Sequence, residues 1–373
     1  MNTCFSESGD FNKFREDLVQ QSEIILSGCL MVFVCDENNW KEADMSSLFQ
    51  TIDVKLIGGV FPQIVYGTKN TTQGYLIVPI ELDLSSVLVH GLDDDSVDFE
   101  AALDEAIEED QEVGSMIVFV DGLSARINSF VDSLFALFGA DVKYIGGGAG
   151  SLSFEQAPCI ICNDGVFKGA AIIGLTKNAL PVEVGHGWEP ISKGHFVTQV
   201  DKNVVKEIDY KNAFDVYEEL INPHMKAEVF NQDNFFEVAQ SFPLGIKKID
   251  GDYVVRDPIS VNDDGHLVCV GELDEGDHID ILHGKPNALI TSSGATAARL
   301  FSNNKGNTQR IFLMDCISRA LFLEGNFPLE LDAIEKEVMG DSSIFGALVL
   351  GEIANSGSGY LEFYNKTTVV SLM

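Results

Sequence analysis

A thiol and a guanidinium lie three residues apart at Cys316 and Arg319, directly after the apolar run 311–314. A nearby guanidinium favours the thiolate form of a cysteine, and the planar fork of an arginine suits a carboxylate or a phosphate. Ligand contact at a strand end is one interpretation, and a structural ion pair of Arg319 with Asp315 or Glu352 is the other. Nucleophilic catalysis by Cys316 is a further hypothesis, although no histidine lies nearby in the sequence to serve as its base.

Arg256 is a second arginine in an apolar setting, directly after Tyr-Val-Val. The chain has only 24 Lys and Arg against 58 Asp and Glu, so an arginine flanked by apolar sequence needs a partner. That partner is either a ligand or, in a structural interpretation, the carboxylate of Asp257 or Asp252.

Two glycine runs, Gly58-Gly59 and Gly146-Gly147-Gly148, permit sharp turns and close approach of the backbone to a ligand. Neither run fits the dinucleotide or phosphate-loop motifs, so nucleotide binding has no motif support. Tight turns alone would explain the glycines. Their recurrence at equivalent places instead predicts that they meet around one pocket.

These residues belong to a unit that recurs along the chain. Three apolar runs end in or next to an acidic residue, at 31–37, 116–122 and 311–316. After the first two runs, a Ser-Leu-Phe start and a Lys-x-Ile-Gly-Gly ending recur, at 47–59 and 133–147. Closing apolar strands are expected at 74–82, 165–175 and 360–372. The third copy is looser, with a helix expected over 329–338, a strand over 345–353 and a glycine turn at Gly357 and Gly359.

The alternation of strands and helices, with closing strands that follow in hairpin fashion, predicts an α/β fold with mixed sheets. The acidic stretch 93–112 carries apolar residues at helical spacing and predicts a solvated helix linking the first two units. A further helix is expected over 212–221, ended by Asn222-Pro223. We therefore expect two domains: 1–222, with units at about 25–90 and 112–180 and a linking segment, and 223–373.

The formal net charge is −34, and the sequence has no cluster of Lys and Arg of the kind that binding to nucleic acids or anionic membranes requires. Binding to either is therefore not expected. The N-terminus shows no signal peptide, and the most apolar run, 24–35, is too short to span a bilayer. Seven cysteines, an odd and scattered set, do not suggest a disulfide framework. The sequence therefore predicts a cytoplasmic globular protein with reduced thiols and no membrane insertion.

Four stretches carry a resemblance to a known family: GHGWEPISKGHF onward (185–220), FPLGIKKIDGDYVVRDP onward (242–279), MDCISRALFLEGNF (314–327) and GALVLGEIANSGSGYLEFYN onward (346–370). The first resembles the end of a FIST N domain, and the others resemble a FIST C domain. The resemblance covers roughly 25–370 and makes 1–222 the FIST N domain and 223–373 the FIST C domain. It implies a sensory signal-transduction protein that binds a small ligand, with amino acids suggested for the family.

One branch of stand-alone FIST proteins, the NosP-like group, binds haem, senses nitric oxide and regulates a partner histidine kinase. The chain resembles that arrangement because no kinase or other output region is recognisable in it. Haem can be held by a single histidine, and His186, between two glycines and followed by Trp188, is the expected iron ligand, with His195 nearby. The alternatives are an amino-acid or small-carboxylate sensor without haem, and an enzyme that uses Cys316.

Overall fold

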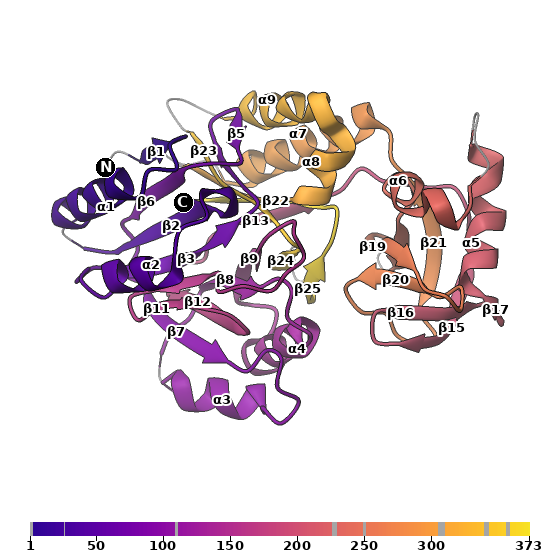
Figure 1. Cartoon of the computed structure of the whole chain (residues 1–373), viewed down its shortest axis with the longest axis horizontal. Coiled ribbons are helices and arrows are strands. Elements are labelled where there is room, and N and C mark those ends of the chain that lie inside the picture. Colours follow the sequence, from indigo (N-terminus) through magenta and orange to yellow (C-terminus); the bar gives the residue numbers. More distant parts are fainter. Residues whose placement is uncertain are drawn as a thin grey trace.

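The computed structural model describes residues 3–25, 27–108, 111–225, 230–248, 251–304, 310–338, 343–355 and 359–373. The chain forms two lobes, which we call the core lobe and the barrel lobe (Figure 1). The core lobe contains three six-stranded sheets and both ends of the chain, and the barrel lobe, residues 189–283, contains the remaining sheet. The mixed α/β class expected from the sequence is confirmed.

Each sheet of the core lobe is built on one of the three recurring units. In every unit two parallel strands lie side by side, and a closing strand pairs antiparallel to the first of them. The strands are β2 (Cys29–Cys35), β3 (Lys55–Phe61) and β6 (Tyr75–Ile80) in the first unit, β8 (Ser115–Asp121), β9 (Lys143–Ala149) and β12 (Ala170–Thr176) in the second, and β22 (Ile311–Cys316), β23 (Ile344–Val349) and β26 (Thr368–Leu372) in the third. The looser third copy therefore forms the same unit as the other two.

A hairpin from each unit leaves its own sheet and extends the sheet of another unit. The hairpin β4 (Gln63–Tyr66) and β5 (Lys69–Thr71) pairs with β23, β10 (Ile160–Cys162) and β11 (Gly165–Phe167) pair with β3, and β24 (Glu352–Asn355) and β25 (Leu361–Tyr364) pair with β9. The first unit thus extends the third sheet, the second extends the first, and the third extends the second. This cyclic exchange gives the lobe an approximate threefold symmetry and makes each unit depend on the other two.

The recurring glycines serve this strand packing. A Cβ on one glycine of the second parallel strand would meet the carbonyl oxygen of the neighbouring strand: 1.9 Å from Val32 for Gly58, 1.7 Å from Val118 for Gly146 and 1.8 Å from Leu313 for Gly346. Only glycine allows the backbones to approach so closely. Added Cβ atoms on Gly59 and Gly147 would also fall within 3.0 Å of protein atoms. Protein atoms therefore fill the space beside these glycines. This corrects the expectation that the glycines surround a ligand.

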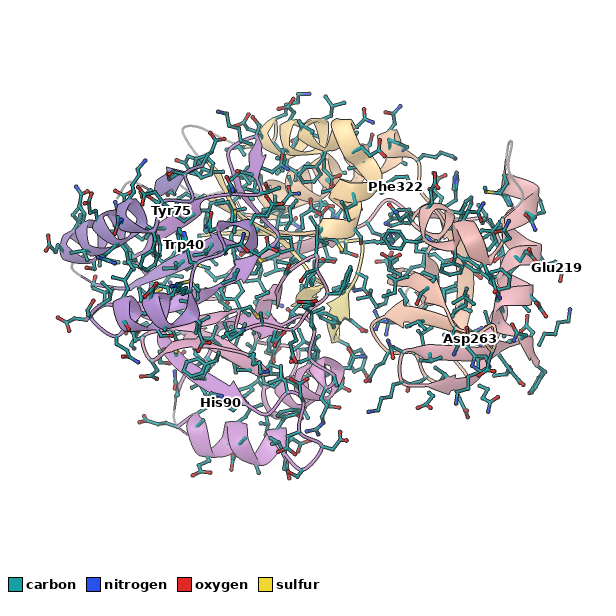
Figure 2. The ribbon with its side chains drawn as sticks, viewed as in Figure 1. Trp40, Tyr75, His90, Glu219, Asp263 and Phe322 are labelled. Carbon is teal, nitrogen blue, oxygen red and sulfur yellow. The ribbon has the colours of Figure 1, made fainter. Side chains whose placement is uncertain are left out.

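Shorter strands and helices complete the core lobe. The strands β1 (Cys4–Ser6), β7 (Ser85–His90) and β13 (Val182–Gly185) extend the first, second and third sheets. The helices are α1 (Phe11–Ile24), α2 (Glu42–Phe49), α3 (Phe99–Ala106), α4 (Ile127–Phe138), α7 (Pro286–Asn303), α8 (Ile317–Leu323) and α9 (Phe327–Glu335), with short 3-10 helices η1 (Asp36–Asn38) and η4 (Glu324–Asn326). In Figure 2, Tyr75 of the first sheet lies near Trp40, which is in the segment between η1 and α2, and the two ring centroids are 6.2 Å apart.

Among the described residues of the acidic stretch 93–112, which was expected to form a solvated linking helix, the helical part is α3. Asp98 caps this helix by accepting a hydrogen bond from the backbone of Ala101, and Phe99 and Leu103 are buried against the second sheet. Glu109 and Asp110 lie outside the described residues, as does Gly357 of the expected glycine turn. Within the described ranges, none of the helices has both the length and the apolar character needed to cross a bilayer.

The barrel lobe is a closed ring of six antiparallel strands. In order around the ring they are β21 (His278–His283), β15 (His195–Asp201), β16 (Val204–Ile208), β20 (Leu267–Val270), β19 (Tyr253–Val261) and β18 (Leu244–Lys247), and β18 pairs back to β21. Short strands β14 (Glu189–Pro190) and β17 (Lys211–Asn212), helices α5 (Ala213–Ile221) and α6 (Phe235–Ala239), and 3-10 helices η2 (Asn222–His224) and η3 (Gln232–Asn234) complete it.

The division expected near residue 222 lies inside this barrel. The helix α5 ends at Ile221, as its Asn-Pro signal predicts. Strands from both sides of that point nevertheless pair in one ring, because β16 pairs with β20 and β15 pairs with β21. In space the barrel lobe is therefore an insertion into the core lobe, attached through residues 186–188 and 284–285.

Candidate functional site

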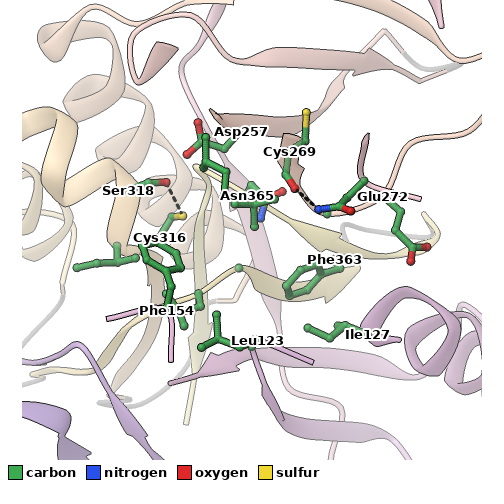
Figure 3. Close-up of a pocket in the computed structure, with 18 of the residues that line it drawn as sticks. Leu123, Ile127, Phe154, Asp257, Cys269, Glu272, Cys316, Ser318, Phe363 and Asn365 are labelled. Carbon is green, nitrogen blue, oxygen red and sulfur yellow. Dashed lines mark hydrogen bonds between the residues drawn. The ribbon is translucent and has the colours of Figure 1, made fainter. Parts of the chain in front are cut away.

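A cavity of about 410 Å³ lies between the two lobes (Figure 3). The core lobe contributes the segments that follow β8, β9, β22 and β23, together with β25 and the connection between β25 and β26, and the barrel lobe contributes α6, β19, β20 and the β15–β16 turn. The carboxyl ends of β8 and β22 thus face the cavity, the edge where ligands commonly bind in α/β sheets. The strand-end position expected for Cys316 does line this cavity.

Most of the cavity wall is apolar. The apolar lining residues are Leu123, Ile127, Leu152, Phe154, Phe236, Ile259, Val270, Ile317, Leu321, Leu350 and Phe363. Three of them are large and exposed at the mouth, with 55% of Phe154, 49% of Phe236 and 39% of Leu321 accessible. The φ of Phe154 is +56°, which is unfavourable for a bulky residue. An apolar wall with an apolar mouth suits a ligand that has an apolar body.

The floor of the cavity is polar. Ser318 Oγ lies 3.1 Å from Cys316 Sγ, in the contact drawn in Figure 3. Asp257 of the barrel lobe pairs with Lys366 of the core lobe at 3.1 Å, and both side chains are buried. Asn365, which is 1% exposed, has a side-chain oxygen with no hydrogen-bond partner in the described structure. The floor therefore joins the two lobes and carries one unsatisfied polar group.

Buried acids surround Cys316 on the side away from the cavity. Burial, and then the neighbouring thiol of Cys316 and carboxyl of Asp315, raise the pKa of Glu352 well above its ordinary value. Burial and the charge of Glu330 raise the pKa of Asp315 in the same way. Among the described residues no histidine lines the cavity. A histidine base for Cys316 is thus not found in the described cavity lining.

Arg319 is fully buried and does not line the cavity. Its Nη2 lies 2.7 Å from Glu330 Oε1 and its Nε lies 3.3 Å from Asp315 Oδ1. It also donates to the backbone carbonyls of His186 and Lys366. The structural interpretation is therefore correct for Asp315, and ligand contact by Arg319 is not, because protein groups occupy its guanidinium. The sequence did not indicate Glu330 as a partner of Arg319, because Glu330 lies eleven residues further along the chain, in the next α-helix, α9.

Arg256 is also buried outside the cavity lining, and neither sequence interpretation describes it. It donates to three backbone carbonyls: those of Glu272 at 2.7 Å, Phe363 at 2.9 Å and Val255 at 3.2 Å. Asp257 pairs with Lys366 instead. Because Phe363 belongs to β25 of the core lobe, Arg256 links the barrel to this strand.

The residues expected to hold haem lie apart from the cavity. The ring of His186 accepts the backbone N–H of Trp188 at 3.0 Å, and burial followed by the charge of Arg319 lowers the pKa of His186 to about 4. Trp188 is buried and donates its indole N–H to the carbonyl of Lys366. His195 lies in the barrel and pairs with Asp209 at 2.7 Å. None of the three lines the cavity, so the lining does not fit a histidine-ligated haem.

The glycines expected at the site are absent from the cavity lining, and the most informative floor residues were not predicted. Gly58, Gly59, Gly146 and Gly147 do not line it. The sequence could have indicated that Lys366 is paired with an acid, because a lysine between two apolar strands is rarely buried without a partner. Which carboxylate would be that partner could not be read from the sequence, since Asp257 lies more than a hundred residues away.

Two family models match the chain: the FIST N domain over residues 29–211 and the FIST C domain over residues 213–355. No curated protein matches it. The junction between the two matches falls at β17 and α5, so each family domain contributes to both lobes and to the cavity between them. FIST domains are associated with sensory signal transduction and small-ligand binding. Because the two matches together cover most of the sequence, the chain belongs to the FIST family.

Proposed function

We propose that this chain is a cytoplasmic sensory protein that binds a small molecule with an apolar body in the cavity between its lobes and thereby regulates a partner protein, such as a histidine kinase. The cavity carries this proposal, because both lobes line it. A ligand that contacts two lobes at once binds some of their relative orientations better than others and shifts their populations. A partner that contacts both lobes would read that shift.

The contacts between the lobes support such a response. Besides the Lys366–Asp257 pair, Lys248 of the barrel lies 2.6 Å from Glu362 of the core lobe, and Lys366 donates to the carbonyl of Gln240. On the core-lobe side these polar contacts lie in β25 and in the connection between β25 and β26. At the mouth, apolar side chains of the two lobes, such as Phe154 and Phe236, stand exposed. The lobes are thus joined at one side of the cavity and open at the other.

Calorimetry and thermal denaturation with a panel of amino acids and small apolar compounds test the site. We expect at least one compound to raise the melting temperature, and Val270→Phe, which narrows the cavity from the barrel side, to abolish the effect. Val268→Phe on the same strand is the matched control, because Val268 does not line the cavity. A ligand that binds both variants equally well would show that the cavity is not the site.

Haem-bound sensing of nitric oxide is the second candidate function. One observation favours it: the low pKa of His186 keeps the imidazole neutral, the form that binds iron. An absorption spectrum of protein from haem-replete cells, repeated on His186→Ala, tests this candidate. A Soret band that the variant loses would support it, and no band together with no stoichiometric uptake of added hemin would contradict it.

A further inference from the structure

The charges at the cavity floor are arranged so that a ligand meets carboxylates rather than cations. Asp257 and Glu272 line the cavity. Lys366 is the partner of Asp257, but its side chain is fully buried and does not line the cavity, whereas 7% of the Asp257 side chain is accessible. A ligand approaching this pair therefore contacts its negative member.

The other cations nearby are also unavailable. The guanidiniums of Arg256 and Arg319 are buried and bonded to protein groups. The one cation in the described lining is Lys202, which is exposed in the β15–β16 turn, where water screens its charge. Within the part of the chain that the structure describes, the cavity interior thus has no positively charged side chain to hold a carboxylate.

The electrostatics of the two lining carboxyls agree with this geometry. Burial raises the pKa of Asp257 and that of Glu272 above their ordinary values, although Lys366 and Lys202 partly oppose the increase. A positive group placed in the cavity would relieve this penalty. The side-chain oxygen of Asn365, which has no hydrogen-bond partner in the described structure and lies beside Asp257 in Figure 3, supplies a hydrogen-bond acceptor at the same place.

We propose that the ligand of this cavity carries a protonated amine, which lies against Asp257 and Asn365, and an apolar body without a carboxylate. This inference rests on the proposed function, because it concerns the same cavity. An ammonium at Asp257 would share that carboxylate with Lys366, the buried cation that joins the lobes. Amine binding would therefore act directly on one of the contacts through which the barrel is held to the core lobe.

Four compounds with one phenyl body and different polar heads test the charge preference by calorimetry: 2-phenylethylamine, L-phenylalanine, 2-phenylethanol and 3-phenylpropionate. We expect the amine to bind tightest, at least about tenfold more tightly than the carboxylate. Tightest binding by the carboxylate, or equal binding by the alcohol and the amine, would overturn the inference while leaving the cavity as a binding site. If none of the four binds and the wider panel is also silent, the proposed function fails and the inference fails with it.

Variants test the assigned partner. Asp257→Asn alone leaves Lys366 buried and unpaired, so the double variant Asp257→Asn/Lys366→Met, which removes both charges, is used beside it. We expect the double variant to bind the amine about tenfold more weakly and the alcohol unchanged. Glu272→Gln should reduce amine affinity by a smaller factor. Asp263→Asn is the control and should change nothing, because Asp263, labelled in Figure 2, is exposed in the turn between β19 and β20 and does not line the cavity. Unchanged amine affinity in the double variant would overturn the assignment of Asp257.

Discussion

The first and third units of the core lobe end their first strand with a cysteine, yet only one of these strand ends opens to a cavity. Cys35 pairs in register with Phe61, and Cys316 pairs with Val349, each at the end of the two parallel strands. Cys35 is buried, with its Sγ 3.4 Å from the carbonyl of Thr71 in β5. Cys316 lies at the floor of the cavity between the lobes.

What covers the strand end decides the difference. In the first unit, Asn38 of η1 bonds both backbone groups of Gly74, and these contacts close the end. In the third unit, α8 follows the strand directly, and the barrel lobe lies over the gap. The same strand unit can therefore be closed at its end and serve only the fold, or can form one side of a binding site, depending on which segment packs over the end of its strands.

The largest expected effect concerns the buried charges behind the open end. Arg319→Met would leave Asp315 and Glu330 buried without their cation, and we expect it to lower the free energy of unfolding by about 3–5 kcal/mol. Urea denaturation measures this change. Arg299→Met is the control, because the Arg299 side chain is 48% exposed and its pair with Glu183 remains accessible to water, so the variant should lose less than about 1 kcal/mol. Equal losses in both variants would show that the buried pairs of Arg319 with Asp315 and Glu330 do not stabilise the third unit.

The fully buried acid beside Cys316, Glu352, predicts a stronger pH dependence than the half-buried acid beside Cys35, because burial raises the pKa of Glu352 well above its ordinary value and raises that of Asp36 less. Folding raises the pKa of the Glu352 carboxyl above its value of about 4.3 in the unfolded chain. The stability that this carboxyl contributes is fully present below that unfolded pKa and is lost as the pH rises toward its pKa in the folded protein. Glu352→Gln removes that loss. Its stability relative to the parent should grow between pH 5 and pH 8, by up to about 1.4 kcal/mol per pH unit. Exposed Glu337→Gln should follow the parent at every pH, and a flat difference for Glu352→Gln would contradict the raised pKa.

A smaller effect is expected at the sealed end. Asn38→Ala removes both hydrogen bonds to Gly74 at a half-buried position, and we expect a loss of about 1–2 kcal/mol in the free energy of unfolding. Urea denaturation at neutral pH measures it. A loss as large as that of Arg319→Met would remove the distinction between a strand end closed by neutral hydrogen bonds and one supported by buried charges.

The smallest effect concerns access to the two thiols. N-ethylmaleimide should label Cys316 several-fold faster than Cys35, because the first thiol lines a cavity and the second is sealed under β5. Peptide mass spectrometry at short reaction times gives the two rates. A compound bound in the cavity should slow labelling of Cys316 alone. Equal rates for the two cysteines would indicate that both ends open to the same extent.

The sequence alone indicated much of the core lobe and part of its site. Long apolar runs are readable as buried strands wherever they pair, so the first strands of all three units, including the looser third copy, were predicted. The family resemblance and the place of Cys316 at a strand end also came from the sequence. The pattern of a buried strand does not state which strand lies beside it, however, and the exchange of hairpins was therefore not predictable.

Only the tertiary structure decided where the lobes divide and which charges are free. The barrel closes through pairs such as β16 with β20, which join segments some sixty residues apart, so no local feature near residue 222 reveals it. The pairing of Lys366 with Asp257 was likewise not predictable, because the partner of a charged side chain is the group that folding places beside it. The sequence determined the elements and the residues with chemical potential. Long-range packing determined that Arg256 and Arg319 support the fold, and that Asp257 faces the cavity.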